Sequence, residues 1–450
     1  MTTPRRPSAA YRAALAVALG VTRLAAPFHA KLARTLAGRS GLRDRLAGWG
    51  ASQRDRARPL VWFHAPSVGE GLQVRPVIEA LRAERPGWQL AYSFFSPSAL
   101  ALSHSLPVDF ADYLPWDRPR DVATALDALA PAALIFGKLD VWPELTLAAA
   151  TRGVRLGLVS ATVAESSSRL AWPARAWVAP AYAALDRIGA IAPEDATRLE
   201  RLGARRQAIT VTGDARYDSV AQRAERLDRT REPFASLAAG AGAETFTIVA
   251  GSTWPADEGV VLPAFAALRA QGEPARLLLA PHEPTPRHLS RIERAARAAG
   301  LPEPVRLSHL RAGAAPINPA LIVVDQTGVL ADLYALGQAA YVGGGYHRAG
   351  LHSVLEPAVF GVPVAFGPRW RMSRDAGTLI ARGAAVALPA EGRRALQEVW
   401  MRWRRDAELR AQAGAAAAAV VREGRGAAAR TAALVIELLE PAGPPPRLRR

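Results

Sequence analysis

The sequence predicts an α/β protein made of two Rossmann-like domains, and three observations indicate this class. From residue 59 onward, short runs rich in β-branched and aromatic residues alternate with amphipathic stretches, which is typical of βαβ units and a parallel sheet. A polar, charge-rich stretch at 218–244 interrupts this alternation, and the same pattern then restarts. The chain has 450 residues, half of them hydrophobic. That length is too great for one core and suits two domains of roughly 150 to 200 residues each.

The candidate strands are spread over both halves of the chain. They are 59–65, 88–95, 132–137, 154–161, 187–192 and 208–213 in the first half, and 245–252, 275–281, 320–326, 339–345, 362–368 and 384–388 in the second. Amphipathic segments such as 70–84 and 118–130 are expected to be the intervening helices. The Ala/Arg-rich run 392–439 is expected to form two closing helices, and 441–450 a frayed tail.

These patterns predict four regions. They are a basic N-terminal region at 1–58, a first Rossmann-like domain at 59–220, a second at 221–425, and a closing helix with a disordered tail at 426–450. The polar stretch at 218–244 is expected to act as the hinge between the two domains.

Most of the positive charge lies in residues 1–58, which hold twelve Lys/Arg against two Asp, a net +10 of the chain's +17. The apolar stretch between Arg12 and Arg23 is too short to span a bilayer comfortably. A helix here suits a membrane surface, with its arginines on anionic headgroups. A targeting peptide or a solvated basic arm is the alternative. Nucleic acid is a less attractive partner because no nucleic-acid module accompanies the charge.

The composition also excludes several kinds of site. The chain has no cysteine, which excludes a disulfide scaffold, a thiol nucleophile and every Cys-based metal site. It contains no D-x-D and no H-E-x-x-H motif, and its eight histidines are scattered. We therefore expect neither a metal nor another cofactor, and a cytoplasmic chain is the simplest interpretation.

Polar residues gather where predicted strands end, and in open α/β sheets ligands bind at the carboxyl ends of the strands. Glu70 follows strand 59–65, and Lys138 and Asp140 follow strand 132–137. Gly251-Ser252-Thr253 and Gly343-Gly344-Gly345 occupy the matching places in the second half. Two such sheets facing each other across a cleft describe a GT-B glycosyltransferase, with the acceptor in the first domain and a nucleotide sugar in the second.

The donor side is expected to lie in the string YVGGGYHRAGLHSVLEP. Its three glycines allow the backbone to approach a ligand closely. Ser353 or His352 is expected to cap the helix that carries Glu356, whose carboxylate is then well placed for a ribose diol. The alternative is that Glu356 complements the helix dipole and the glycines only make a turn.

Five sequence strings, taken in their order along the chain, resemble the 3-deoxy-D-manno-octulosonic acid (Kdo) transferases of lipopolysaccharide synthesis. They are HAPSVGEGLQVRPVIEALR, FFSPSAL, TGDARYDSV, VAGSTWPADE and LHSVLEPAVFGVPVAFGP. The resemblance runs from about residue 59 to 390. It implies an inverting GT-B enzyme that uses CMP-Kdo as co-substrate and adds Kdo to a lipid A precursor at the cytoplasmic face of the inner membrane. It also implies that Glu70, in SVGE, is the catalytic base. An N-terminal capping role for Glu70 is the alternative.

A base beside a helix start has its pKa lowered by the dipole, so partial burial against Trp62, Phe63 or bound lipid is expected to offset this. Other residues are expected to bind charged groups of the substrates. Those for the donor are Ser252, Thr253, His282, Gly343, Gly344, Gly345, Ser353 and Glu356, and those for the acceptor, a carboxylate or a phosphate are Ser67, Lys138, Asp140 and Arg216. Lys138 stands out because it is one of only two lysines, and a compact ammonium can fit where a planar Arg does not. Chance retention of a surface Lys is the alternative.

Some strings depart from the family pattern. KLDVWP replaces E-T-E-L-W-P, PHEPTPR replaces P-R-H-P-E-R, SATVAESS replaces N-A-R-L-S-x-R-S, and LHSVLEP replaces G-H-N-x-L-E-P. Arg287 or His282 is expected to substitute for the displaced arginine near the nucleotide. Two other functions stay open: transfer of a different nucleotide-activated sugar to another anionic membrane acceptor, and a non-catalytic relative that only binds the membrane surface.

Overall fold

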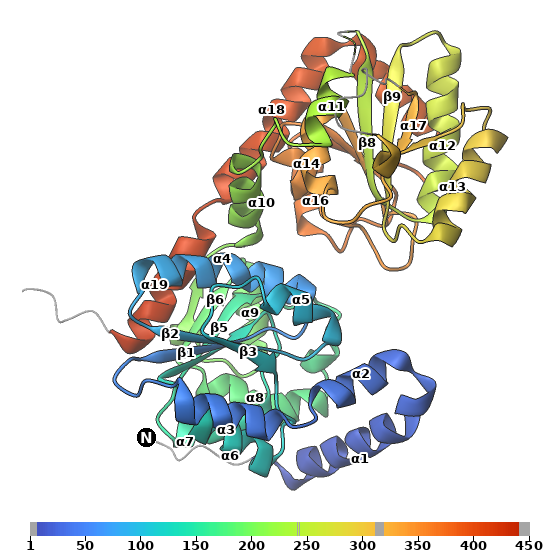
Figure 1. The fold of residues 1–450 in the computed structure, drawn as a ribbon. Helices are drawn as coiled ribbons and strands as arrows, with labels where there is room; N and C mark the ends of the chain where they lie inside the picture. Colours follow the sequence, from blue (N-terminus) through green and yellow to red (C-terminus); the bar gives the residue numbers. More distant parts are fainter. Residues whose placement is uncertain (1–6, 241, 243, 311–318, 441–450) are drawn as a thin grey trace, which may run out of the picture. The chain divides into compact units, whose positions relative to one another are not determined.

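The structure, a computed structural model, describes residues 7–240, 242, 244–310 and 319–440. The predicted tail at 441–450 lies outside this range. The chain forms two compact units, unit 1 (Met1–Ser219 with Gly424–Arg450) and unit 2 (Val220–Glu423). Each unit is a doubly wound α/β layer structure with one parallel seven-stranded sheet (Figure 1).

Unit 1 is built on a sheet with the strand order β3-β2-β1-β4-β5-β6-β7. Its strands are β1 (Leu60–His64), β2 (Gln89–Phe94), β3 (Phe110–Tyr113), β4 (Ala133–Gly137), β5 (Arg155–Ala161), β6 (Arg187–Ala190) and β7 (Ile209–Val211). Its helices are α1 (Ala9–Ala25), α2 (Ala30–Gly38), α3 (Leu42–Ser52), α4 (Val68–Glu84), α5 (Leu100–Ser103), α6 (Pro119–Leu129), α7 (Pro143–Thr151), α8 (Ala174–Ala184), α9 (Pro193–Arg201), α10 (Arg216–Glu225), which runs into unit 2, and α19 (Ala427–Leu439).

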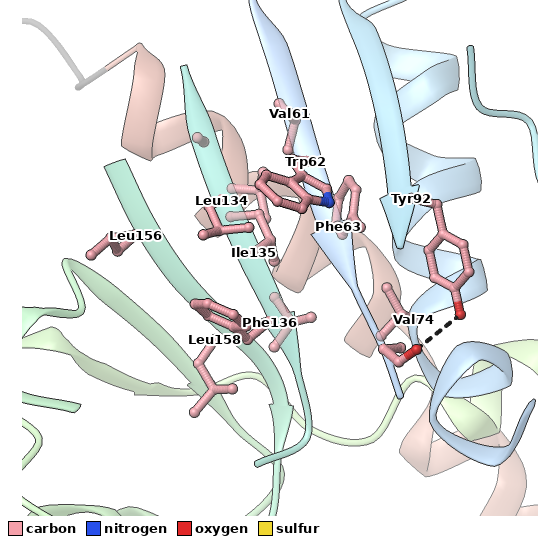
Figure 2. Packing of buried hydrophobic residues seen from close by; sticks show 14 of the residues in the cluster. Val61, Trp62, Phe63, Val74, Tyr92, Leu134, Ile135, Phe136, Leu156 and Leu158 are labelled. Carbon is pink, nitrogen blue, oxygen red and sulfur yellow. Dashed lines mark hydrogen bonds between the residues drawn. The ribbon is translucent and has the colours of Figure 1, made fainter. Parts of the chain in front are cut away.

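The core of unit 1 explains why its strands are almost uniformly apolar. Strand β1 pairs with β2 on one side and β4 on the other, and all five of its residues are buried because helices cover both faces of the sheet. Figure 2 shows Trp62 and Phe63 of β1 packed among Leu134, Ile135 and Phe136 of β4. Helix α4 places Val74, Val77, Ile78 and Leu81 against this core at helical spacing.

Unit 2 repeats the architecture with the strand order β10-β11-β9-β8-β12-β13-β14. Its strands are β8 (Phe246–Thr253), β9 (Ala275–Pro281), β10 (Val305–Arg306), β11 (Leu321–Val323), β12 (Ala339–Val342), β13 (Val364–Phe366) and β14 (Ala385–Ala387). Its helices are α11 (Phe234–Ala239), α12 (Pro255–Ala270), α13 (Pro286–Ala298), α14 (Leu330–Leu333), α15 (Leu355–Ala358), α16 (Arg374–Ala381), α17 (Gly392–Arg405) and α18 (Ala407–Gly424), which returns to unit 1.

The predicted fold class is confirmed, and all twelve predicted strands are present. Two short, partly buried edge strands, β3 and β10, were not predicted. The closing run 392–439 forms three helices rather than two, because Asp406 and the Arg425–Gly426 turn interrupt it. Gly426 has φ +86, a left-handed conformation that suits glycine.

The domain boundaries differ from the predicted ones at both ends of the chain. Helix α3 was assigned to a separate N-terminal region, but Leu42, Leu46 and Trp49 are buried in the core of unit 1 and α3 packs on α6. Helix α19 also belongs to unit 1, where it packs on α4 and β5 (Figure 1). Unit 1 is therefore discontinuous in sequence, with unit 2 inserted between β7 and α19.

Candidate active site

In unit 1 four of the predicted site residues, Ser67, Glu70, Lys138 and Asp140, lie where the strand order reverses, between β1 and β4. Ligands of doubly wound sheets bind at such switch points, outside the carboxyl ends of the strands. Glu70 stands in the first turn of α4, directly after β1, and Lys138 and Asp140 follow β4.

The Glu70 carboxylate is held by three donors. Lys138 Nζ lies 3.1 Å from Oε1, the Ser67 hydroxyl donates to Oε2, and the backbone N–H of Glu70 itself also contacts the carboxylate. Ser67 is the N-cap residue of α4, yet its side chain caps no backbone N–H because it is turned toward Glu70. The structure thus brings Ser67, Glu70 and Lys138 together, and the carboxylate keeps 20% side-chain exposure.

Electrostatics at Glu70 differ from the prediction. Burial raises the pKa of Glu70, but the Ser67 hydrogen bond and the Lys138 charge outweigh it, so the net pKa is lowered. Partial burial does raise the pKa, as expected, but it does not offset these contacts; Trp62 and Phe63 lie in the core and are at most 1% exposed. The carboxylate is ionised and paired, which makes it a weak base as it stands.

Asp140 belongs to a second network that sequence reasoning missed. Its Oδ2 accepts from His64 Nε2 at 3.0 Å and from Trp142 Nε1 at 2.9 Å, while Arg169 lies 3.7 Å from Oδ1. Burial raises the pKa of Asp140, but these donors outweigh it and the net pKa is lowered. His64 is fully buried, and its Nδ1 lies 3.0 Å from the Ser93 hydroxyl. The one signal in the sequence was a polar histidine at the end of an otherwise apolar strand.

Arg216 does not join these residues. Its guanidinium donates to Asp214 Oδ2 at 2.9 and 2.6 Å, an interaction between neighbours at the start of α10. The motif TGDARYDSV therefore encodes a local ion pair in unit 1. Its Asp218 accepts from the backbone N–H groups of Gly426 and Ala428, which ties α10 to the start of α19.

In unit 2 the string Gly251-Ser252-Thr253 ends β8 instead of forming a turn after it, so that expectation was wrong. Ser252 adopts φ +54, a left-handed conformation that is uncommon for a residue with a side chain, and the pairing with β9 shifts register there. Ser252 is half-buried. Thr253 is fully buried, and its hydroxyl lies 3.1 Å from Glu258 Oε1, so it faces the protein interior.

Glycines 343–345 allow neighbouring segments of the backbone to lie very close to one another. A Cβ on Gly343 would lie 2.3 Å from the Ser252 carbonyl oxygen, and one on Gly344 2.1 Å from that of Gly350. Gly344 also has φ +93. The N–H groups of Gly343 and Gly344 donate to Gly251 and Asp257, so these two donors are used within the protein. All three glycines are buried.

Asp257, which was quoted in a motif but given no role, organises this loop. Its fully buried carboxylate accepts from Trp254 N and Gly344 N at 2.9 Å, from the Tyr341 hydroxyl at 2.8 Å and from Tyr346 N at 3.4 Å. The start of α12, the end of β12 and the glycine turn are thereby joined through one side chain.

A stack of aromatic rings lies at the same strand ends. Trp254 has the His347 ring 4.0 Å away, nearly parallel, and the His282 ring at 4.6 Å. His282 stacks on His352 at 4.5 Å, and Trp254 Nε1 donates to His352 Nε2 at 3.1 Å. Burial, together with the neighbouring His282, lowers the pKa of His352 to about 4, so this ring is neutral.

Glu356 lies in the first turn of the short helix α15. Burial raises its pKa, with Arg223 acting in the opposite direction. Ser353 and His352 do not cap α15 as predicted, because the N-cap residue is Val354 and no side chain caps the helix. In the part of the chain that the structure describes, no donor lies within hydrogen-bond distance of the Glu356 carboxylate, and Ser353 is half-buried.

Among the described residues, no group of three or more His, Asp or Glu side chains is placed to hold a metal ion. Arg287, offered as a substitute near the nucleotide, lies in the first turn of α13 and is exposed.

The N-terminal helix is the one described segment, Ala9–Phe28, that is long and apolar enough to cross a membrane. It anchors to unit 1 through Arg12 and Glu144, 2.8 Å apart, and through Tyr11 and Asp117. Beyond these anchors it exposes Val17, Val21, Leu24 and Phe28 by 59 to 83%. Within the basic region 1–58, Arg12, Arg43 and Arg45 form ion pairs in unit 1, and Arg39 is buried.

Comparison with known proteins agrees with this picture. Residues 40–219 match the family model described as 3-deoxy-D-manno-octulosonic-acid transferase (kdotransferase). The chain is 33% identical to the 3-deoxy-D-manno-octulosonic acid transferase of Bordetella pertussis over 350 residues, covering 73% of this chain and 76% of that protein.

Solved structures show the fold. A putative UDP-N-acetylglucosamine 2-epimerase of Listeria monocytogenes superposes with a TM-score of 0.60 at 14% identity, covering 86% of this chain and 98% of its own. A glycosyltransferase of Rickettsia africae gives 0.57 at 10% identity, covering 86% and 100%. Both share the GT-B type of α/β fold predicted from the sequence. Together with the match to the Bordetella enzyme, this establishes that the chain belongs to the 3-deoxy-D-manno-octulosonic acid transferase family and is a glycosyltransferase.

Proposed function

We propose that this protein transfers Kdo from CMP-Kdo to a phosphorylated lipid A precursor, with inversion at the anomeric carbon, at the cytoplasmic face of the inner membrane. The observation that carries the proposal is the ionised, partly exposed Glu70 carboxylate beside the Lys138 ammonium at the switch point of the unit 1 sheet.

In this reaction Glu70 takes the proton of an acceptor hydroxyl while the hydroxyl oxygen attacks C2 of Kdo. The bond from C2 to the phosphate oxygen breaks, and CMP leaves with the electron pair. A single displacement of this kind inverts the configuration, and one positioned base typically contributes 10²–10⁴-fold. No covalent intermediate is formed.

The donor is assigned to unit 2, where Ser252, His282, Ser353 and Glu356 stand at or near strand ends. Glu356 has a carboxylate without a donor among the described residues, which suits the hydroxyl groups of a ribose. The half-buried ring stack around Trp254 offers flat faces next to the glycine turn. We propose no metal or other cofactor for this site.

The acceptor is assigned to unit 1 because that unit holds both the base and the apolar helix α1. Three exposed apolar side chains on α1, together with Phe28 just after it, provide the means to reach a lipid at a bilayer surface. Arg23 and Lys31 are exposed and have no ion-pair partner among the described residues, so they are available to anionic headgroups.

The test is incubation with CMP-Kdo and a bisphosphorylated lipid A precursor in detergent, followed by mass analysis of the lipid. We expect a mass increase of one or more Kdo units, and NMR of the product is expected to show an anomeric configuration opposite to that of the donor. UDP-sugars offered in place of CMP-Kdo separate this function from transfer of another sugar. The absence of any increment, under conditions where the Bordetella enzyme gives one, would refute the proposal.

A further inference from the structure

Lys138 holds Glu70 in a contact that a general base cannot keep during its reaction. The ammonium lies 3.1 Å from Oε1, and the side chains are 38% exposed for Lys138 and 20% for Glu70. In the part of the chain that the structure describes, Lys138 Nζ has no other acceptor. A carboxylate paired in this way binds a further proton poorly, whereas base catalysis requires it to accept one.

The backbone aims this lysine at Glu70. Lys138 has φ +62, a left-handed conformation that is unfavourable for a residue with a Cβ. Its N–H still donates to the Val159 carbonyl at 2.8 Å, so the sheet pairing of β4 and β5 extends past the strand and fixes the strained residue. Strain that the surroundings maintain at a strand end commonly accompanies function.

The chemistry of the side chain is also specific. All but two of the 57 Lys and Arg residues in the chain are arginine. An ammonium on a flexible stem can turn between two anions, whereas a guanidinium is suited to one fixed bidentate partner. At this exposure the pair with Glu70 contributes little net free energy, so a phosphate can compete for the ammonium.

We propose, building on the proposed function, that Lys138 couples the basicity of Glu70 to acceptor binding: an anionic phosphate group of the acceptor attracts the ammonium and withdraws it from the carboxylate. Glu70 then becomes a stronger base only when the acceptor is in place. Without an acceptor, the paired carboxylate activates water poorly, and CMP-Kdo is protected from hydrolysis. Lys138 thereby determines specificity for phosphorylated acceptors.

The first test is kinetic and compares Lys138→Met, Lys138→Arg and, as a matched control, Arg152→Met, which removes an exposed cation that pairs with Asp127 elsewhere in unit 1. We expect CMP release from CMP-Kdo without acceptor to rise roughly two- to five-fold in Lys138→Met, the range of a half-exposed ion pair. The preference for a bisphosphorylated over a dephosphorylated acceptor is expected to shrink in the same variant. Lys138→Arg is expected to release Glu70 less readily, because a guanidinium favours one fixed bidentate partner, and so to lower transfer to the bisphosphorylated acceptor. Arg152→Met is expected to match the parent in both assays.

The second test does not depend on activity. Glutamate labelled with ¹³C at the carboxyl carbon allows the Glu70 titration to be followed by NMR, with Glu70→Gln assigning the signal. Inorganic phosphate is the probe, and it is expected to shift the titration toward higher pH in the parent protein but not in Lys138→Met. Tyr92, whose pKa is raised above its ordinary value by burial and by the Glu70 charge, stays protonated throughout.

These outcomes separate the two proposals. If phosphate leaves the Glu70 titration unchanged, or if Lys138→Met loses transfer equally with both acceptors and shows no added hydrolysis, the coupling is refuted while Kdo transfer stands. If phosphate moves the titration but the lipid gains no Kdo, the coupling is supported and the proposed donor or acceptor is wrong.

Discussion

The substitution Asp257→Asn tests whether one buried carboxylate assembles the strand ends of unit 2. Asp257 accepts four hydrogen bonds, two of them from the backbone N–H groups of Trp254 and Gly344 to the same oxygen, Oδ2, at 2.9 Å. An asparagine can keep its carbonyl oxygen toward Trp254 and Gly344 and donate from its NH₂ group to the Tyr341 hydroxyl, but that group then faces the N–H of Tyr346. One backbone donor is left without an acceptor.

The expected cost follows from that geometry. A polar group that loses its partner costs about 1–3 kcal/mol, so the substitution is expected to destabilise unit 2 by about that amount. With an m-value of about 2 kcal/mol per molar urea, the midpoint of unfolding falls by roughly 0.5–1.5 M. Donor binding is expected to weaken as well, because the glycine turn loses one of the links that hold it to α12.

The assay is urea unfolding of the full chain, with hydrogen exchange of peptides from 246–281 reporting on unit 2 alone, since a chain of two units need not unfold in one step. Glu398→Gln is the matched control because it breaks an exposed ion pair with Arg394 in the same unit, which is worth about 0.5 kcal/mol at most. If Asp257→Asn leaves both the midpoint and CMP affinity where the control leaves them, the organising role of this carboxylate is wrong.

Three further substitutions address the base, the membrane contact and Asp140. Glu70→Gln is expected to reduce transfer by about 10²–10⁴-fold with CMP affinity within about two-fold, measured by product formation and calorimetry; equal loss of both would contradict a base. Replacing Leu24 and Phe28 by Glu is expected to lower flotation with anionic vesicles by at least about ten-fold, since each buried side chain contributes about 1.5–3 kcal/mol, whereas Met372→Glu in unit 2 is expected to have no effect. Because the pKa of Asp140 is lowered in the folded protein, its contribution to stability is present above its ordinary pKa and is lost as pH falls through the folded value. The difference in unfolding free energy between the parent and Asp140→Asn is therefore expected to shrink on acidification below the ordinary carboxyl range, and a constant difference would refute this.

Much of the fold could be predicted because parallel strands that are buried on both faces consist of short runs of apolar residues, which are visible in the sequence. Strands β3 and β10 escaped because they lie at sheet edges, where fewer residues are buried and the apolar signal is weak. Helix α3 was misassigned because its arginines suggested a membrane surface, although Arg43 pairs with Asp121 of α6, far along the chain.

The site was predicted less completely than the fold. Glu70 and Lys138 could be singled out from their places after strands, but their mutual contact depends on the left-handed backbone of Lys138, which no local pattern indicates. His64 and Asp257 were missed because a single buried polar residue in a strand or helix looks like ordinary core until its partners are known. Those partners, Asp140 and Gly344, lie 76 and 87 residues away.

The insertion of unit 2 between β7 and α19 has a consequence for how the chain is made. Helix α19 packs on α4 and β5, so the larger part of the unit 1 sheet leaves the ribosome well before the helix that covers it. Unit 2 is continuous and has its complete sequence available first. Unit 1, which bears Glu70, therefore cannot complete its core until all of unit 2 has been synthesised.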